Sequence, residues 1–369
     1  MQCQILAAKD GYIFYDKCFG YHTYKKETPV SSDDVYDLAS LTKILATTPS
    51  LMAMVDQARI LLDARLSDYL LYLRGTNKED LGFREVLTHQ AGLRPWIPYY
   101  ENTLINERWD TLVYRPVITE EFPVRVAKNM YIREHYRFKI YQDIVNSELG
   151  EKSLAYSDLG FYLFQDMMVH LTNLPFDQFV YDFFYTPLGL NHLRFKPLKY
   201  FPVKNIIPTE FDRKFRQQVL VGDVHDQGAA MLGGVAGHAG LFGNSRDVAV
   251  MMQMFLNKGT YGGRVFFSPH VVTEFTRCQF PEQDNRRGLG FDKPLLEYED
   301  HRSNCRDASP SSFGHSGFTG TYTWADPETG LIYVFLSNRI HPDMDNRLIM
   351  EHDVRTNIHQ LFYEAIKQR

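Results

Sequence analysis

Ser40 and Lys43 are the two residues of this chain whose types and spacing best suit covalent chemistry. A helix that begins near Ala39 would place their side chains on the same face, one turn apart. In that position a lysine amine can take the proton of a serine hydroxyl and make the oxygen a nucleophile for acyl transfer. The hydroxyl would also lie at a helix N-terminus, where unpaired N–H groups favour negative charge. The competing interpretation is an exposed helix start without chemistry, because serine and lysine are common residues.

An acyl-transfer site also needs a second group that carries protons. A tyrosine two residues before an asparagine or aspartate is one form of such a group. The chain contains four of these: Tyr100-Glu-Asn102, Tyr141-Gln-Asp143, Tyr156-Ser-Asp158 and Tyr298-Glu-Asp300. Spacing leaves all four open. The surrounding sequence favours Tyr156 and Asp158, because Ser157 or Asp158 can cap a helix that starts at Leu159 and presents both side chains to a cleft.

Hydrogen-bond donors for an oxyanion are the third requirement, and the segment His315-Ser316-Gly317 lies directly before a predicted hairpin. Gly317 has no side chain, so a substrate that runs along Ser316 and Gly317 can approach the backbone closely. The N–H of Phe318 would then pair with the N–H of Ser40 as an oxyanion hole. Loss of one such donor costs about 10²–10³ in rate.

Both ends of the chain have strand patterns, and the middle is mostly helical. The predicted strands cover residues 4–8, 12–15, 319–325 and 331–337, with turns at 9–11 and 326–330. Apolar residues at helical spacing occupy 44–55, 83–89, 159–168, 246–256 and the last fifteen residues or so. The pattern predicts an α/β (α+β) fold in which both ends share one antiparallel sheet flanked by helices.

We expect the whole chain, residues 1–369, to form a single domain with two lobes. The sheet lobe would comprise residues 1–38 and 245–369, and the helical lobe residues 39–244. Residues 93–152 are irregular and rich in Tyr, Trp and Pro, which is long for a structureless connection and is typical of a segment that shapes a binding site.

Four aromatic residues of that segment are candidates for the wall of a substrate pocket: Trp96, Tyr99, Tyr100 and Tyr131. The alternative for each is ordinary hydrophobic packing under a long loop.

Composition excludes several classes of function. With 40 Lys and Arg against 45 Asp and Glu, the net charge is −5, and no basic cluster indicates a nucleic-acid surface. No apolar run reaches the roughly 18 residues of a membrane span. The chain starts with a strand pattern instead of a signal peptide. We therefore expect a cytoplasmic protein, or a periplasmic or secreted one if the chain has been cut from a longer precursor.

The sequence also predicts that the protein uses neither a metal nor another cofactor. The four cysteines form no Cys-x-x-Cys pair, and Cys3 and Cys18 are expected to be free thiols, with a hairpin disulfide as the alternative. His89, His225 and His238 lack metal-ligand spacing with one another or with Asp226. Hydrogen bonds that fix loops are their expected role. The glycine-rich segment 233–240 lacks the pattern of a phosphate loop.

The order of these motifs resembles that of the penicillin-binding-protein and β-lactamase superfamily of serine hydrolases, which has Ser-x-x-Lys, then Tyr-x-Asn, then Lys/His-Thr/Ser-Gly. The chain looks most like the class C branch, which includes esterases and D-amino-acid peptidases. The supporting stretches are Leu87-Thr-His-Gln-Ala-Gly-Leu93, Tyr156-Ser-Asp-Leu-Gly160, Pro187-Leu-Gly-Leu190 and His315-Ser-Gly317. Three further stretches resemble the β-lactamase-like domains that Bacteroides-type bacteria carry behind a family 3 glycosidase domain: Val224-His-Asp226, Gly237-His-Ala-Gly240 and Ser337-Asn-Arg-Ile-His-Pro342.

The resemblance implies a β-lactamase/transpeptidase-like fold and a role for each motif. Ser40 would be the nucleophile, Lys43 its deprotonating or field-setting partner, and Tyr156 the second acid/base. The backbone amides of Ser40 and Phe318 would hold the oxyanion. Whether Lys43 or Tyr156 takes the first proton stays open.

Two departures from the family pattern bear on the substrate. Asp158 stands where the family has an asparagine that donates a hydrogen bond, and an ionised Asp158 would instead keep Lys43 protonated. His315 stands where lysine commonly attracts a carboxylate, and imidazole is only fractionally charged near neutral pH. Both changes weaken recognition of an anionic β-lactam. We therefore expect an ester or amide as substrate and weak β-lactamase activity at best.

A different class of function stays open beside the enzyme: a non-catalytic domain that binds cell-wall peptide or glycan next to a glycosidase. The family fold usually starts with a helix for which this chain has no room. We therefore expect a groove that a preceding glycosidase domain or a second copy of the chain could fill.

Overall fold

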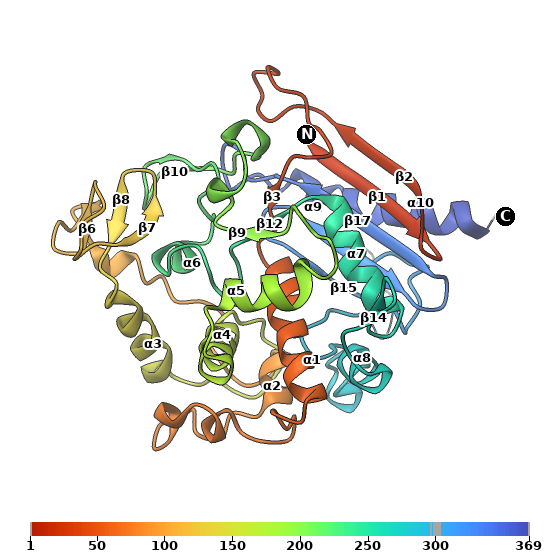
Figure 1. Ribbon diagram of the computed structural model, residues 1–369, viewed down its shortest axis with the longest axis horizontal. Coiled ribbons are helices and arrows are strands. Elements are labelled where there is room, and N and C mark those ends of the chain that lie inside the picture. Colours follow the sequence, from red (N-terminus) through yellow and green to blue (C-terminus); the bar gives the residue numbers. More distant parts are fainter. Residues whose placement is uncertain (1, 296, 298–303, 368–369) are drawn as a thin grey trace.

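The computed structural model describes residues 2–295, 297 and 304–367, and in it the two ends of the chain share one sheet (Figure 1). The five antiparallel strands follow the order β15-β16-β17-β1-β2. Their bounds are β1 (Cys3–Lys9), β2 (Tyr12–Phe19), β15 (Phe313–Ser316), β16 (Tyr322–Asp326) and β17 (Leu331–Ser337). The predicted antiparallel sheet from both termini is confirmed.

Alternation of side chains gives this sheet two buried faces. Leu6 of β1 lies opposite Val334 of β17, and both join the main core with α7 (Ser245–Leu256). The next pair, Ile5 and Phe335, points to the other face. There α9 (Leu348–Glu351) and α10 (Val354–Lys367) cover a second cluster of aromatic residues. The sheet is therefore a middle layer with helices on both sides.

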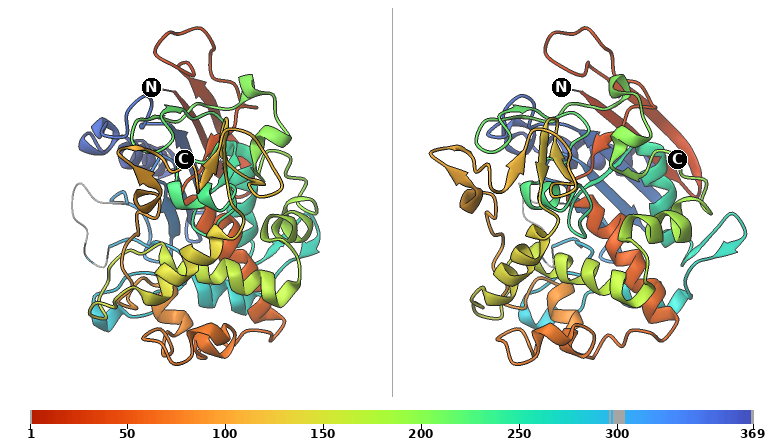
Figure 2. Two further views of the ribbon diagram at one scale, coloured as in Figure 1. Left: turned by 90° about the vertical axis from the view of Figure 1, so that its left-hand side faces the viewer. Right: turned by 60° about the vertical axis from the view of Figure 1, so that its left-hand side comes forward.

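The helical half is centred on α1 (Thr48–Asp56) and α4 (Leu159–Thr172), with α2 (Phe83–Leu87) and α8 (Pro269–Thr276) beside them. Gly160 allows α4 to lie close to α2, because a Cβ there would meet the Val86 side chain at 2.2 Å. Figure 2 shows these helices packed below the sheet. The core continues from the sheet into this half without a break.

Shorter elements complete the chain. The helices are α3 (Tyr136–Asn146), α5 (Phe176–Val180) and α6 (Gln227–Met231). A three-stranded sheet has the order β3-β12-β9, from β3 (Tyr36–Asp37), β9 (Arg194–Phe195) and β12 (Leu241–Gly243). Another has the order β6-β8-β7, from β6 (Tyr114–Arg115), β7 (Val124–Ala127) and β8 (Met130–Ile132). Three two-stranded ribbons are β4 (Leu104–Ile105) with β5 (Arg108–Trp109), β10 (Phe211–Asp212) with β11 (Gln218–Val219), and β13 (Thr260–Tyr261) with β14 (Arg264–Val265).

The irregular segment 93–152 does hold short elements, as expected: β4 to β8 and α3. They form the projecting part at the left of Figure 1. The division into two lobes stays a prediction. The predicted sheet lobe includes α8, but α8 lies against α1 of the helical half. The predicted boundary at residue 245 therefore does not separate two groups of elements that contact only each other.

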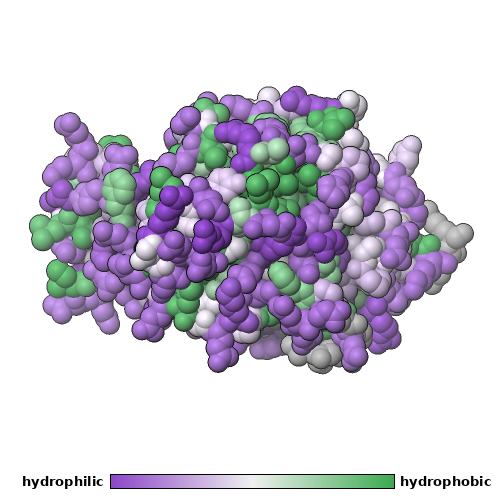
Figure 3. Space-filling model, turned by 90° about the horizontal axis from the view of Figure 1, so that it is seen from below, coloured by the Kyte–Doolittle hydropathy of each residue, from purple (hydrophilic) through white to green (hydrophobic). Residues whose placement is uncertain are grey.

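All four cysteines are free, with Cys3 paired to Phe19 instead of Cys18 across the hairpin. Among the described residues, no helix is both long enough and apolar enough to cross a membrane. The face seen from below is largely hydrophilic and carries its apolar side chains in separate patches (Figure 3).

Candidate active site

Ser40 lies in a tight turn between β3 and the first helical segment. The backbone of Ala39 has a φ of +47°, a left-handed value that is unusual for a residue with a side chain. The Asp37 side chain supports this conformation by accepting hydrogen bonds from the N–H of Ala39 (2.9 Å) and of His225 (2.7 Å). The helix starts at Leu41, two residues later than predicted, so the turn and not the helix carries the serine.

Lys43 is fully buried and connects Ser40 to Asp158. Its ammonium donates to the Ser40 Oγ at 3.0 Å, to the Asp158 carboxylate at 2.6 Å and to the His238 carbonyl at 3.3 Å. Burial works against the charged form, but the Asp158 carboxylate and the Tyr156 side chain outweigh it, so the pKa of Lys43 is raised. Lys43 is therefore an ammonium at neutral pH, as the aspartate in place of asparagine led us to expect.

Tyr156 is placed by the segment that leads into α4. Ser157 fixes that segment: its hydroxyl donates to the Arg94 carbonyl (2.6 Å) and accepts from the N–H of Leu159 (3.2 Å). Ser157 thus supports the start of the helix, while the side chain of Asp158 turns to Lys43 and does not cap it. The Lys43 ammonium lies 5.0 Å from the centre of the Tyr156 ring. Within the described chain, the buried Tyr156 hydroxyl has no hydrogen-bond partner.

His315 carries no charge, which corrects the expectation of a fractionally charged imidazole. Burial, with the nearby Arg287 and Lys43, lowers the pKa of His315 to about 3. Its Nδ1 lies 2.7 Å from the Ser316 carbonyl oxygen, which can only accept, so Nδ1 bears the proton. The Nε2 atom is therefore an acceptor, and it has no partner among the described residues.

The turn after β15 is fastened to the backbone before Ser40. Thr319 and Thr321 donate their hydroxyls to the carbonyls of Asp37 (2.8 Å) and Leu38 (3.0 Å). Gly317 is required at this point, because a Cβ there would meet the Leu38 carbonyl oxygen at 2.6 Å. The turn thus brings Phe318 next to the serine loop.

Both predicted oxyanion donors are free to bind a ligand. In the part of the chain that the structure describes, neither the Ser40 N–H nor the Phe318 N–H has a protein acceptor. The Phe318 side chain is half exposed and stacks on His225, with ring centres 5.4 Å apart. These observations suit the predicted oxyanion hole, which stays a prediction.

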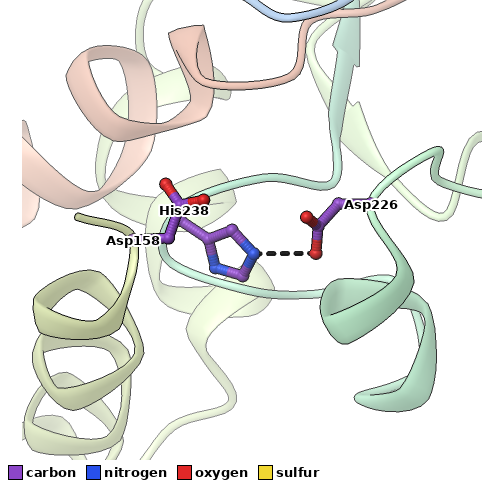
Figure 4. Close-up of side chains that lie close together, drawn as sticks. All are labelled: Asp158, Asp226 and His238. Carbon is purple, nitrogen blue, oxygen red and sulfur yellow. Dashed lines mark hydrogen bonds and ion pairs between the residues drawn. The ribbon is translucent and has the colours of Figure 1, made fainter. Parts of the chain in front are cut away.

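A second carboxylate and a histidine lie beside Asp158, although their sequence spacing gave no sign of it. Asp226, Asp158 and His238 each bring one potential metal-ligand atom within 4.8 Å of the others (Figure 4). Both carboxylates already have cationic or hydrogen-bonding partners: Asp158 pairs with Lys43, and Asp226 accepts from His238 Nε2 at 2.8 Å. The His238 interaction helps to hold the pKa of Asp226 below its usual range despite burial. The prediction of a metal-free site stays a prediction.

The glycine-rich segment 233–240 brings His238 to this cluster. A Cβ on Gly237 would lie 2.1 Å from the Phe161 carbonyl oxygen, so only glycine lets the loop cross α4 this closely. Thr47 holds the loop from the other side by donating to the Gly237 carbonyl at 2.6 Å. Hydrogen bonding that fixes loops was the expected role of the three histidines. His89 accepts from the Ser157 N–H at 3.1 Å, and His225 lies 3.0 Å from Glu210.

The aromatic pocket candidates have different surroundings, and Tyr131 lies in β8. Trp96 is partly exposed, and the neighbouring Pro95 carbonyl accepts the Asp158 N–H at 3.0 Å, so Trp96 lies beside the site. Tyr99 and Tyr100 are buried and pack on Tyr162 and Phe215, respectively. Contact between any of them and a substrate stays a prediction.

The other tyrosine motifs lie elsewhere or outside the described residues. The Tyr141 hydroxyl donates to the Tyr162 carbonyl, and Asp143 pairs with Lys139 on the surface. Tyr298 and Asp300 are outside the part of the chain that the structure describes. Sequence reasoning missed Asp37, Thr319 and Thr321 as supports of the site, because single common polar residues give no spacing signal.

Comparison with known proteins shows the family of the chain. Residues 3–354 match the family profile described as Beta-lactamase. The chain belongs to the β-lactamase family. A relative from Salmonella agona (strain SL483), named "Putative D-alanyl-D-alanine carboxypeptidase", is 32% identical over 371 residues, which cover 93% of this chain and 79% of the relative.

Solved structures of other proteins share the fold at lower identity. Simvastatin synthase from Aspergillus terreus superposes with a TM-score of 0.69 at 17% identity, covering all of this chain and 91% of its own. A family VIII carboxylesterase superposes with a TM-score of 0.62 at 19% identity, covering 94% and 88%. The β-lactamase/transpeptidase-like fold expected from the sequence is confirmed. The narrower likeness to domains behind a Bacteroides-type glycosidase stays a prediction.

Proposed function

We propose that this member of the β-lactamase family is a serine hydrolase that forms an acyl-enzyme on Ser40. The contact that carries the proposal is the 3.0 Å hydrogen bond from the buried Lys43 ammonium to the Ser40 Oγ. A buried cation at this distance favours the negative charge that develops on the oxygen as its proton leaves. The two unpaired N–H groups of Ser40 and Phe318 would hold the oxyanion of the tetrahedral intermediate.

In the proposed reaction Ser40 Oγ attacks the carbonyl carbon of an ester or amide. The serine proton passes through the site to the leaving alkoxide or amine, which departs as an alcohol or amine. Water then attacks the acyl-serine, giving a carboxylic acid and restoring the hydroxyl. Because Lys43 is held as an ammonium, it has no lone pair with which to accept the first proton. The Tyr156 oxygen is therefore the proposed first acceptor.

We propose that the substrate is an ester or amide without a carboxylate next to the scissile bond. The neutral His315 supplies no positive charge, and the Asp158 carboxylate cannot donate a hydrogen bond to an amide carbonyl. An esterase fits these features best, with a D-amino-acid peptidase next. The fold shared with a carboxylesterase supports the esterase. The Salmonella relative's name supports peptidase chemistry only, because a carboxypeptidase cleaves next to a free carboxylate, which this proposal excludes.

The reaction as proposed uses no metal and takes place in one domain spanning residues 1–369. Because Lys43 and His238 already interact with the two carboxylates, a cation at Asp158 and Asp226 would have to displace these contacts. We also propose that residues 1–38 and 245–369 form the sheet lobe and that residues 39–244 form the helical lobe, with Ser40 at the start of the latter.

Intact mass after incubation with a fluorophosphonate tests the nucleophile. The wild type should gain the mass of one probe, and Ser40→Ala should gain none. Absence of an adduct on the folded wild type would overturn the proposal and favour a non-catalytic binding domain.

Steady-state rates then test the substrate class. We expect kcat/KM for p-nitrophenyl butyrate to exceed that for nitrocefin by about 10²-fold, since a missing contact with a charged group costs about 1.5–3 kcal/mol. A D-alanyl-D-alanine peptide with an amidated C-terminus should react faster than the same peptide with a free carboxylate. Efficient nitrocefin hydrolysis would contradict the proposed preference.

A further inference from the structure

Arg287 is a buried cation that the proposed reaction has not yet used. Its side chain is only 10% exposed, and its guanidinium carbon lies 5.3 Å from the centre of the Tyr156 ring. At that distance a cation is attracted to the face of an aromatic ring. No sequence motif pointed to Arg287.

The nearest carboxylate does not account for the position of Arg287. Asp292 is 2.9 Å from Arg286 but 3.8 Å from Arg287, so Arg286 makes the closer ion pair. The Nη1 atom of Arg287 is buried, and within the described residues it has no hydrogen-bond partner. A buried charge without full hydrogen bonding is costly, which points to a role outside the ion pair.

Among the described residues, this arginine and the site lysine are the cations recorded beside the Tyr156 ring. The charged and titratable groups around it are Lys43, His89, Asp158, Arg287 and His315, with Asp292 next to Arg287. His89 lies with its ring centre 4.3 Å from that of Tyr156, and His315 at 6.0 Å. Burial, reinforced by the charge of Arg287, lowers the pKa of both imidazoles, so neither is a cation at neutral pH. Lys43 is already matched by Asp158 at 2.6 Å.

We propose that Arg287 is a positioning residue that stabilises the anionic form of Tyr156 and thereby lets Tyr156 accept the Ser40 proton. The inference rests on the proposed function. As the bond from Ser40 Oγ to the carbonyl carbon forms, the phenolate takes the serine proton and becomes a neutral phenol. When the tetrahedral intermediate collapses, the phenol gives that proton to the leaving alkoxide and the phenolate returns. The guanidinium favours the charged tyrosine at both ends of this cycle.

The test variants are Arg287→Met and Arg287→Lys. The control is Arg286→Gln, which removes the other cation paired with Asp292 and does not change the neighbour of Tyr156. We would measure kcat/KM for p-nitrophenyl butyrate from pH 6 to pH 10. Arg287→Met should move the acid limb of the profile upward by about 1 pH unit, which is about a tenfold loss of rate below the limb. Arg287→Lys should restore most of the shift, and Arg286→Gln should keep the wild-type profile.

Direct titration of Tyr156 separates this inference from the proposed function. The difference in tyrosinate absorbance between each protein and its Tyr156→Phe counterpart reports Tyr156 ionisation whether or not the protein turns over an ester. Arg287→Met should need a higher pH for this ionisation. If Arg287→Met fails to fold, Arg287→Gln takes its place, since its amide stays polar but carries no charge.

An acid limb and a Tyr156 titration that are unchanged in a folded Arg287→Met or Arg287→Gln protein would overturn the inference. A shift of equal size in Arg286→Gln would do the same, because it would assign the effect to the ion pair. If the wild type lacks both ester turnover and a Ser40 adduct, the proposed function fails by itself, and the Tyr156 titration still decides the role of Arg287.

Discussion

Two clusters of tyrosine and histidine lie at different places in this molecule, and they differ in how many of their buried polar atoms are hydrogen-bonded. Between the sheet and α10, the Asp326 carboxylate accepts hydrogen bonds from the Tyr363 hydroxyl and from the Ser309 hydroxyl, each at 2.6 Å. His359 stacks on Tyr333 with ring centres 4.7 Å apart. In this cluster, which we call the α10 cluster, Asp326 is surrounded by donors.

The active-site cluster leaves the corresponding atoms without partners. The Tyr156 hydroxyl, the His315 Nε2 and the His89 Nε2 are buried and unpaired in the described part of the chain. Among the described residues, the α10 cluster has one such atom, the Tyr333 hydroxyl. Since a buried unpaired polar group costs about 1–3 kcal/mol, the active-site cluster is the less stable arrangement. We infer that its unpaired atoms are kept for a substrate and for moving protons.

Replacement of Lys43 by methionine should have the largest effect on activity. The variant loses the cation at the Ser40 Oγ, so kcat/KM for p-nitrophenyl butyrate should fall by about 10³-fold or more. The matching change in the α10 cluster is Asp326→Asn, which should cost about 1–3 kcal/mol in the free energy of unfolding and leave kcat/KM within about threefold. Urea unfolding and steady-state rates measure both. Loss of activity in a stable Asp326→Asn protein would break the distinction between the clusters.

Acid should destabilise both clusters through their buried histidines. Burial lowers the pKa of His315 and of His359 to about 3, whereas the unfolded chain binds these protons near pH 6.5. The unfolded state therefore binds more protons between pH 6.5 and 3, and stability falls as the pH falls through this window. Each histidine should cost about 1.4 kcal/mol per pH unit below pH 6.5.

Urea unfolding of the wild type at pH 7 and pH 5 measures this loss. His315→Gln and His359→Gln should each reduce the loss by about 2 kcal/mol. If only one of these variants reduces the loss of stability, the histidine replaced in the other variant is not kept neutral by burial. The two clusters would then differ in how they respond to acid.

Replacement of Asp158 by asparagine should have a smaller effect, on specificity. The amide can donate a hydrogen bond to a substrate carbonyl, and loss of the carboxylate lowers the pKa of Lys43, because Asp158 is what raises it. We expect the ratio of kcat/KM for nitrocefin to that for p-nitrophenyl butyrate to rise about tenfold.

Asp143→Asn is the control for this change. Asp143 also follows a tyrosine by two residues and also pairs with a lysine, Lys139, but on the surface of α3. It should leave the ratio unchanged. An equal response in the two variants would show that the effect does not depend on Lys43.

The fold could largely be read from local patterns. Strands β1, β2, β16 and β17 follow from residues that alternate or cluster around turns, and α7 and α10 follow from apolar residues at helical spacing. The predicted start of the first helical segment, near Ala39, was two residues too early. Ala39 adopts a left-handed backbone because Asp37 holds its N–H, and such a contact is not visible as periodicity.

The sequence by itself indicated the partners Ser40 and Lys43, because a serine directly before a helix lies close to the side chain three residues later. It also indicated that an ionised Asp158 would keep Lys43 protonated, once Tyr156 and its neighbours were chosen as the second motif. Only the tertiary structure decided the charge on His315 and the place of Arg287 beside Tyr156. Burial determines the charge of His315, and the approach of segments more than a hundred residues apart places Arg287 beside Tyr156. Local sequence spacing indicates neither.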